Sequence, residues 1–180
     1  MSLGRVLYRV RQFTLALRAA VDPGDLEQAR SVLTPAQLAL FAGMQPSEQA
    51  HAVSMYRQLV DQGETSPDLL LAALLHDVGK SRSPIRLWER VLIVFGKAIF
   101  PAQSRRWGNS SVEQAGRQGW RRVFVVAEQH PAWGAALAAE AGASPRTVVL
   151  IRLHQDPPST EADPEVKRLL GKLQAVDDHN

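Results

Sequence analysis

The stretch LLLAALLHDVGK, at Leu69–Lys80, decides the fold of this chain. Seven apolar residues run directly into an imidazole, a carboxylate and, after Val78 and Gly79, an ammonium group. The apolar run predicts a buried helix, yet charged groups are costly to bury unless they are paired or bound to a metal ion. Two interpretations of this stretch are open: a core helix whose polar end reaches water, or a helix that presents His76 and Asp77 as a site inside the protein.

The composition predicts one globular domain with nitrogen- and oxygen-based chemistry. The chain has 180 residues, of which 45% are hydrophobic and 22% charged, a balance typical of a folded domain with a good-sized core. It contains no cysteine, which excludes disulfides, thiolate metal sites and cysteine nucleophiles. Any bound metal ion must therefore have nitrogen and oxygen ligands, which suit Mn, Fe, Co, Ni, Zn or Mg.

Proline and its neighbours indicate an all-α fold. A capping side chain precedes a proline at five places: Asp22-Pro23, Thr34-Pro35, Ser66-Pro67, Ser144-Pro145 and Asp163-Pro164. This pair is typical of a helix start, and no stretch alternates with the period of a strand. Helices are predicted at 3–20, 23–32, 35–43, 48–62, 69–76, 87–100, 131–141, 148–153 and from Asp163 to about Val176. Ser47 is expected to cap the fourth helix, Pro131 to open another, and residues 101–119 to form a loop.

Positive charge is concentrated in one segment of the chain. Between Lys80 and Arg122 ten basic residues oppose only two acidic ones, a charge of +8 against −5 elsewhere. Such a segment favours an anionic substrate such as a phosphate, but it also suits a solvated basic face, a nucleic-acid site or an anionic membrane. No signal-peptide pattern or bilayer-length apolar run is evident, so a cytoplasmic protein is expected.

Four of the five histidines fall on or beside different predicted helices, at His51, His76, His130 and His154. A lone histidine on an apolar helix is usually a core residue with a hydrogen bond. Four together, with Asp77 beside one of them and Asp177 on the last helix, favour a metal site built from converging helices.

This pattern resembles the HD-domain metal-dependent phosphohydrolases. The superfamily has a histidine, then a His-Asp pair, then a distal aspartate, and two-metal members add two histidines in between. The matching positions here are His51, His76, Asp77, His130, His154 and Asp177. The text around His130-Pro131 and Ile151–His154 is similar to members that hydrolyse dinucleoside polyphosphates symmetrically. Asp178 is an alternative ligand to Asp177. Asp177 fits the family pattern better, because it directly follows the apolar helix.

The resemblance implies a single HD domain over 1–180: an all-α bundle at 47–180 with a basic insertion at about 81–122, and an N-terminal helical extension at 1–46. It implies one or two divalent metal ions that activate a water for hydrolysis of a phosphoester or pyrophosphate, the substrate being a phosphorylated small molecule such as a nucleotide. Asp77 and Lys80 are the expected catalytic residues, although Lys80 could instead only cap a helix. The alternatives are a non-catalytic metal- or nucleotide-binding regulatory module and a basic helical protein that binds nucleic acid or membrane. The motifs characteristic of the branches that degrade cyclic di-GMP and hydrolyse (p)ppGpp are absent.

Overall fold

Helices form every regular element that the structure, a computed structural model, describes. It describes residues 23–110, 119–156 and 163–179, and the predicted helix over 3–20 lies outside them. The first elements are α2 (Pro23–Ser31), α3 (Pro35–Ala42), α4 (Pro46–Asp61), α5 (Pro67–Leu75) and the 3₁₀ helix η1 (Val78–Arg82). The later ones are α6 (Leu87–Ile99), α7 (Pro101–Gly108), η2 (Gly119–Arg121), α9 (Arg122–Glu140), α10 (Pro145–Leu153) and α11 (Pro164–His179). The predicted all-α class is confirmed for these residues.

Four of the five side chains that precede the prolines, Thr34, Ser66, Ser144 and Asp163, cap their helices as predicted, and the fifth, Asp22, lies outside the described residues. The hydroxyl of Thr34 accepts a hydrogen bond from the backbone N–H of Gln37 at 3.4 Å, and that of Ser144 accepts from Thr147 at 3.1 Å. Ser66 does the same at the start of α5. The predicted cap at Ser47 is wrong: α4 begins one residue earlier, and its N-cap is Gln45, whose backbone N–H donates to Glu48 at 3.3 Å.

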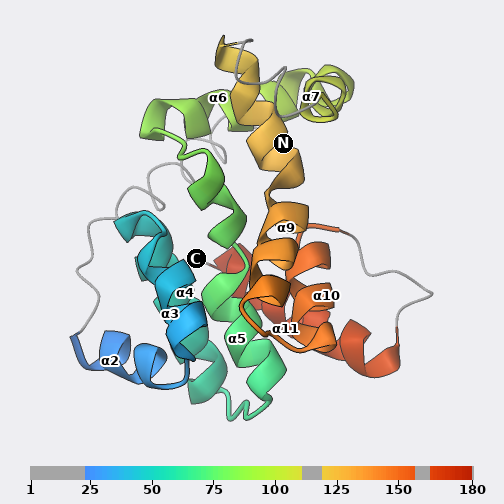
Figure 1. Cartoon of the computed structure of the whole chain (residues 1–180). Coiled ribbons are helices and arrows are strands. Elements are labelled where there is room, and N and C mark those ends of the chain that lie inside the picture. The colour runs from blue at the N-terminus through green and yellow to red at the C-terminus, as the bar shows by residue number, and fades with distance from the viewer. Residues whose placement is uncertain (1–22, 111–118, 157–162, 180) are drawn as a thin grey trace.

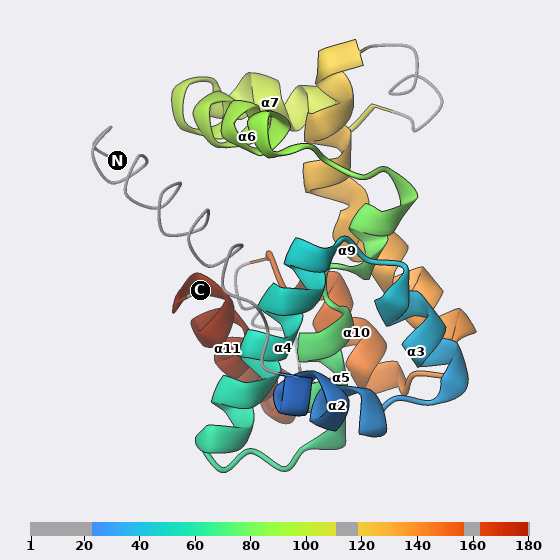
Figure 2. The same cartoon turned by 90° about the vertical axis from the view of Figure 1, so that its left-hand side faces the viewer.

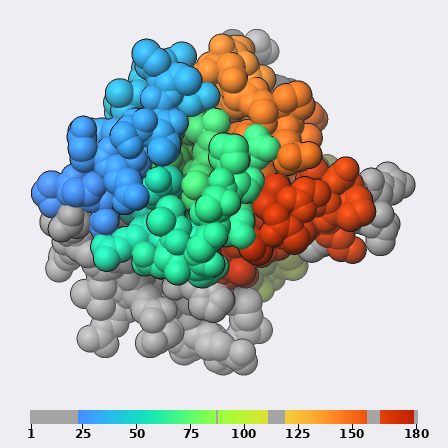
Figure 3. All heavy atoms as spheres, turned by 90° about the horizontal axis from the view of Figure 1, so that it is seen from below, coloured from blue at the N-terminus to red at the C-terminus, as the bar shows by residue number. Residues whose placement is uncertain are grey.

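One hydrophobic core joins most of the helices. Buried side chains of α3, α4, α5, α10, α11 and the second half of α9 meet there, with α2 covering one side. Opposite α6 and α7, residues of α2–α5, α9, α10 and α11 come together at the lower face (Figure 3). This core surrounds α5, which contains the apolar run Leu69–Leu75.

Helices α6 and α7 lie outside this core, beside the first turns of α9 (Figures 1 and 2). A smaller apolar cluster holds them, in which Phe124 contacts the rings of Trp107 and Trp120 at 5.1 and 6.1 Å between centroids. Within the described residues, no helix combines the length and apolar character needed to cross a membrane.

Two predicted boundaries between 101 and 141 are wrong. Residues 101–108, expected in a loop, form α7, because Pro101 opens a turn that Trp107 anchors on α9. Residues 111–118 of that expected loop lie outside the described part. Pro131 does not open a helix but lies buried inside α9, where its missing N–H removes one helical hydrogen bond. Packing on both sides of this position keeps α9 continuous, with Val123–Ala127 buried before it and Gly134, Ala135 and Ala138 buried after it.

Candidate metal centre

Helices α5 and α10 are a matched pair that brings His76 and His154 together. Each has nine residues, and each ends with a histidine at its C-cap. Their N-terminal ends are joined by Asp68, whose carboxylate accepts hydrogen bonds from the hydroxyls of Ser144 and Thr147, the latter at 3.1 Å. Because the two helices start together, pack along each other and have equal length, their terminal imidazoles meet, with ring centroids 5.1 Å apart.

The next two site residues come from α4 and α11. Nε2 of His51 lies 2.9 Å from Oδ1 of Asp177, and that same oxygen lies 3.9 Å from Nε2 of His76. The side-chain amide of Gln174, one turn before Asp177, donates to the backbone oxygen of His154 at 3.1 Å. Asp178, the alternative to Asp177, is exposed. The structure therefore brings Asp177 to the histidines.

A close backbone contact places His130 against the same group. Gly79, in η1, packs directly on α9: a Cβ atom added to it would lie 2.0 Å from the backbone oxygen of His130 and 2.7 Å from the nitrogen of Gly134. Only glycine permits this approach. Gly79 thus has a packing role, and the prediction that α5 stops near it is imprecise, because α5 ends at Leu75 and η1 runs through Gly79.

Together these elements form a row of four imidazoles along one carboxylate. Centroid distances are 5.3 Å from His51 to His76 and 5.2 Å from His154 to His130. Oδ1 of Asp77 lies 3.2 Å from Nε2 of His130 and 3.9 Å from that of His154, whereas Oδ2 lies 3.6 Å from Nε2 of His76. Asp77 thus joins two groups that could each hold a metal ion, one with His51 and His76 and one with His130 and His154.

The hydrogen bonds of three imidazoles direct lone pairs at this carboxylate. The Nδ1 atoms of His76, His130 and His154 lie 3.0, 2.9 and 2.7 Å from the backbone oxygens of Ala73, Val126 and Ile151. A carbonyl oxygen can only accept, so each Nδ1 carries the proton and each neutral ring keeps a lone pair on Nε2. Metal-binding histidines typically donate one ring N–H to a carbonyl or carboxylate in this way, which fixes the tautomer and the orientation of the ring.

Two of these Nε2 atoms, on His76 and His154, are buried and have no hydrogen-bond partner. The third, on His130, faces a carboxylate oxygen that is also an acceptor, and the amide of Gln155 lies 3.4 Å away. Buried acceptors without donors are rare in folded proteins. A cation among them would satisfy all three lone pairs and the carboxylate at once, so this donor set fits a divalent metal ion.

Burial of the imidazoles and the positive charge beside Asp77 set the protonation states that metal binding requires. Burial lowers the pKa of His76, and it lowers the pKa values of His130 and His154 to about 4. For Asp77 burial alone would raise the pKa, but Lys80 first and His76 next hold it well below its usual range. Near neutral pH the imidazoles are therefore neutral and the carboxylate is charged, as metal ligands must be.

Lys80 contacts the same carboxylate, at the oxygen that also faces His76. Its ammonium Nζ lies 2.5 Å from Oδ2 of Asp77, and its side chain is 19% exposed. The ammonium group of Lys80 is therefore paired with a residue of the candidate site. Lys80 also lines a cavity of about 180 Å³ together with Asp77, Asp177 and His51, the imidazole at one end of the row.

Three further residues beside the site were not predicted from the sequence. Glu48 is buried, lines this cavity, and accepts a hydrogen bond from Arg90 at 2.9 Å. Burial raises the pKa of Glu48. Its position three residues before His51, on the same face of α4, was a usable signal. Arg90 was hidden among many basic residues, and Gln155 follows His154 directly.

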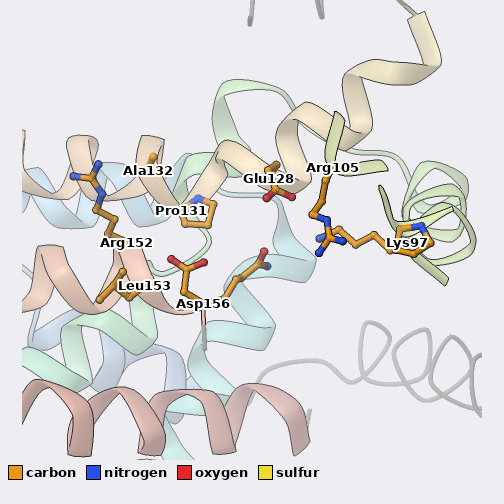
Figure 4. A pocket seen from close by; sticks show the side chains of 10 residues that line it. Lys97, Arg105, Glu128, Pro131, Ala132, Arg152, Leu153 and Asp156 are labelled. Atoms are coloured by element: carbon orange, nitrogen blue, oxygen red, sulfur yellow. The ribbon is translucent and has the colours of Figure 1, made fainter. Parts of the chain in front are cut away.

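A second cavity, of about 490 Å³, adjoins the first, and Gln155 lines both. Its walls come from α6, α7, α9 and the end of α10. Arg152 and Arg105 stand toward opposite ends with Asp156 between them, and Lys97 lies beyond Arg105 (Figure 4). Within the described part of the chain, no carboxylate lies within ion-pair distance of these three cations.

Comparisons with family models, with curated proteins and with solved structures find no match to this chain.

Proposed function

We propose that this protein is a metal-dependent phosphohydrolase of the HD-domain type, which hydrolyses a phosphoester or pyrophosphate bond of an anionic small molecule such as a nucleotide. One observation carries the proposal: three imidazole lone pairs converge on the buried carboxylate of Asp77, and two of them have no partner. His51, His76, Asp77, His130, His154 and Asp177 would hold one or two ions. Because imidazole ligands predominate, Mn, Fe, Co, Ni or Zn are preferred over Mg.

Bound divalent ions would supply a hydroxide near neutral pH and offset the negative charge of the phosphoryl oxygens. The chain's own residues prepare the site for this chemistry. Asp77 presents its two oxygens to the two histidine pairs, and the carbonyl contacts of His76, His130 and His154 hold the rings in one orientation. Lys80, on the wall of the smaller cavity, would contact the phosphoryl group of the substrate. Arg105 and Arg152, on the larger cavity, would attract the remainder of an anionic substrate.

The test is metal analysis followed by an activity screen. The protein is purified, its metal content is measured by mass spectrometry, and it is assayed with p-nitrophenyl phosphate, its bis-ester and a panel of mono-, di- and polyphosphorylated nucleosides at several divalent ions. We expect bound transition metal and hydrolysis, both lost in His76→Ala and Asp77→Ala. Unchanged activity in either variant would contradict the mechanism.

Asp177→Asn and Asp178→Asn form a matched pair, because the two aspartates are adjacent and only Asp177 contacts His51. We expect the first substitution to reduce metal content and the second to leave it unchanged. If the protein binds metal stoichiometrically and hydrolyses none of the substrates, it is a regulatory binding module and the enzymatic proposal fails.

A further inference from the structure

Helix α6 is an apolar helix that the described part of the protein buries only in part. Trp88, Leu92, Phe95 and Ile99 follow each other at spacings of three and four residues and therefore share one face. Leu92 and Phe95 are only half-buried, whereas Trp88 and Ile99 are 57% and 61% exposed. No apolar side chain that the structure describes in α6 is fully buried. A helix of this composition normally buries one face completely, but no described residue covers this face of α6 completely.

Large exposed apolar side chains gather at this end of the molecule. Phe100, which joins α6 to α7, is 60% exposed, and Trp120, before α9, is 46% exposed. Among the described residues, the other large hydrophobic side chains that are exposed are Val32 and Val149, and both lie elsewhere on the molecule. Exposed apolar groups gathered in one place mark an interaction site, whereas scattered ones need no explanation.

The exposed charged residues in 86–110 and at Arg121 are all basic, whereas Glu128, exposed on α9 beside α7, lines the larger cavity with Arg105. These basic residues are Arg86, Lys97, Arg105, Arg106 and Arg121. The single acidic residue of 86–110, Glu89, is buried and binds Arg122 at 2.7 Å. The α6–α7 surface, defined as the exposed residues of 86–110 with Trp120 and Arg121, is thus aromatic, aliphatic and cationic.

We propose that the α6–α7 surface docks this protein on an anionic lipid bilayer. Tryptophan and phenylalanine side chains favour the depth of the lipid headgroups, aliphatic side chains enter the acyl boundary, and arginine and lysine contact the lipid phosphates. A second copy of the chain would bring two cationic surfaces together, which is unfavourable. A nucleic acid would neutralise the cations but would leave the aliphatic part of the stripe, such as Ile99, without a partner. The proposal does not depend on the metal chemistry.

The position of α6 and α7 suits this role. They stand out from the main helical bundle, at the end of α9 opposite the lower face (Figures 1 and 2). Their attachment is close, since a Cβ atom on Gly96 would lie 2.5 Å from the ring of Phe124. The α6–α7 surface therefore lies on two helices that pack closely against α9.

The experiment is sedimentation of the full chain with vesicles of phosphatidylcholine alone or mixed with phosphatidylglycerol. We expect binding to the anionic vesicles only, with a blue shift of tryptophan fluorescence that is smaller in Trp88→Phe. Trp88→Ser/Ile99→Ser removes two side chains that would enter the bilayer, and Arg105→Glu/Arg106→Glu reverses two charges that would contact lipid phosphates, so each double variant should weaken binding roughly tenfold or more. Val32→Ser/Val149→Ser, which removes exposed valines elsewhere, is the matched control and should bind as wild type.

Several results would overturn the proposal. They are the absence of binding to anionic vesicles, an equal loss of binding in the valine control, and binding to RNA or DNA without binding to vesicles. A concentration-dependent dimer that Trp88→Ser/Ile99→Ser abolishes, without vesicle binding, would assign the surface to a second copy instead. Since the substituted side chains are exposed, each variant should fold, and circular dichroism checks this.

Discussion

Gly79→Ala should separate the two halves of the candidate metal centre. The added Cβ would lie 2.0 Å from the backbone oxygen of His130, about 1.4 Å short of the 3.4 Å at which ordinary contact begins. Its other close neighbour is the backbone nitrogen of Gly134, at 2.7 Å. Neither atom can rotate away as a side chain could, so η1 and α9 must move apart. Asp77 precedes η1 and His130 lies on α9, and their side chains are only 3.2 Å apart.

The cost can be estimated from this overlap. Forcing extra volume into a packed interior costs about 1–3 kcal/mol, which lowers the melting temperature of a protein of this size by about 2–12 °C. Metal binding should suffer more, because ligands must stay within about 0.5 Å of their productive positions. We therefore expect Gly79→Ala to fold with a lowered melting temperature and to lose most of its bound metal, as measured by calorimetry and elemental mass spectrometry.

Gly171→Ala is the matched control for this substitution. Gly171 lies inside α11, and a Cβ atom added there meets nothing within 4 Å. Alanine in a helix interior is favoured over glycine by about 0.5–1 kcal/mol, so this variant should keep its metal and melt at the same or a higher temperature. If Gly79→Ala behaved like Gly171→Ala in both measurements, the tight contact between η1 and α9 would be refuted.

Three other predictions follow from the site. The pKa values of His130 and His154 are about 4 in the folded protein and near 6.5 in the unfolded chain, so below pH 6.5 the unfolded chain binds more protons. The metal-free protein should therefore keep its full stability above pH 6.5 and lose several kcal/mol, in order of magnitude, as the pH falls toward 4. A flat profile of melting temperature against pH would contradict this. Asp68→Ala breaks the link between the starts of α5 and α10 and should cost about 1–2 kcal/mol and weaken metal binding measurably by calorimetric titration, whereas Asp61→Ala on the exposed end of α4 should not. Arg105→Ala should raise KM for a polyphosphorylated nucleotide by about tenfold but leave p-nitrophenyl phosphate unaffected; equal effects on both substrates would exclude a role for the larger cavity.

Much of the candidate site could be predicted because its residues obey local rules. Ser66 and Ser144 mark helix starts that fix where His76 and His154 fall, and the hydrogen-bonded caps are present as predicted. Asp77 could be singled out because a carboxylate at the end of a buried helix requires a partner. What could not be predicted is the shared length of α5 and α10 and their link through Asp68, since that contact joins residues far apart in the sequence.

The errors arose where tertiary packing overrides a local signal. Pro131 after a polar residue looks like a helix start, yet buried residues before and after it hold α9 together across the missing hydrogen bond. Residues 101–108 carry few apolar side chains, so their sequence favoured a loop. Trp107 nevertheless packs on Phe124 and anchors them as α7. Glu48 was missed because its partner, Arg90, lies 42 residues away.

The free energy of burying these side chains distinguishes a metal-binding site from a polar core that serves stability alone. A core that served stability alone would gain by replacing His76 and His154 with apolar residues, because each leaves a buried acceptor without a donor, at a cost of about 1–3 kcal/mol. The neighbouring charge of Asp77 is balanced by Lys80, but that ammonium does not reach the two imidazole acceptors, which stay without partners. What is missing is specific: both unpaired atoms are buried nitrogen acceptors, and both lie around the carboxylate of Asp77. A divalent cation would satisfy these acceptors, and its binding would then stabilise the fold by an amount that the metal-free protein lacks.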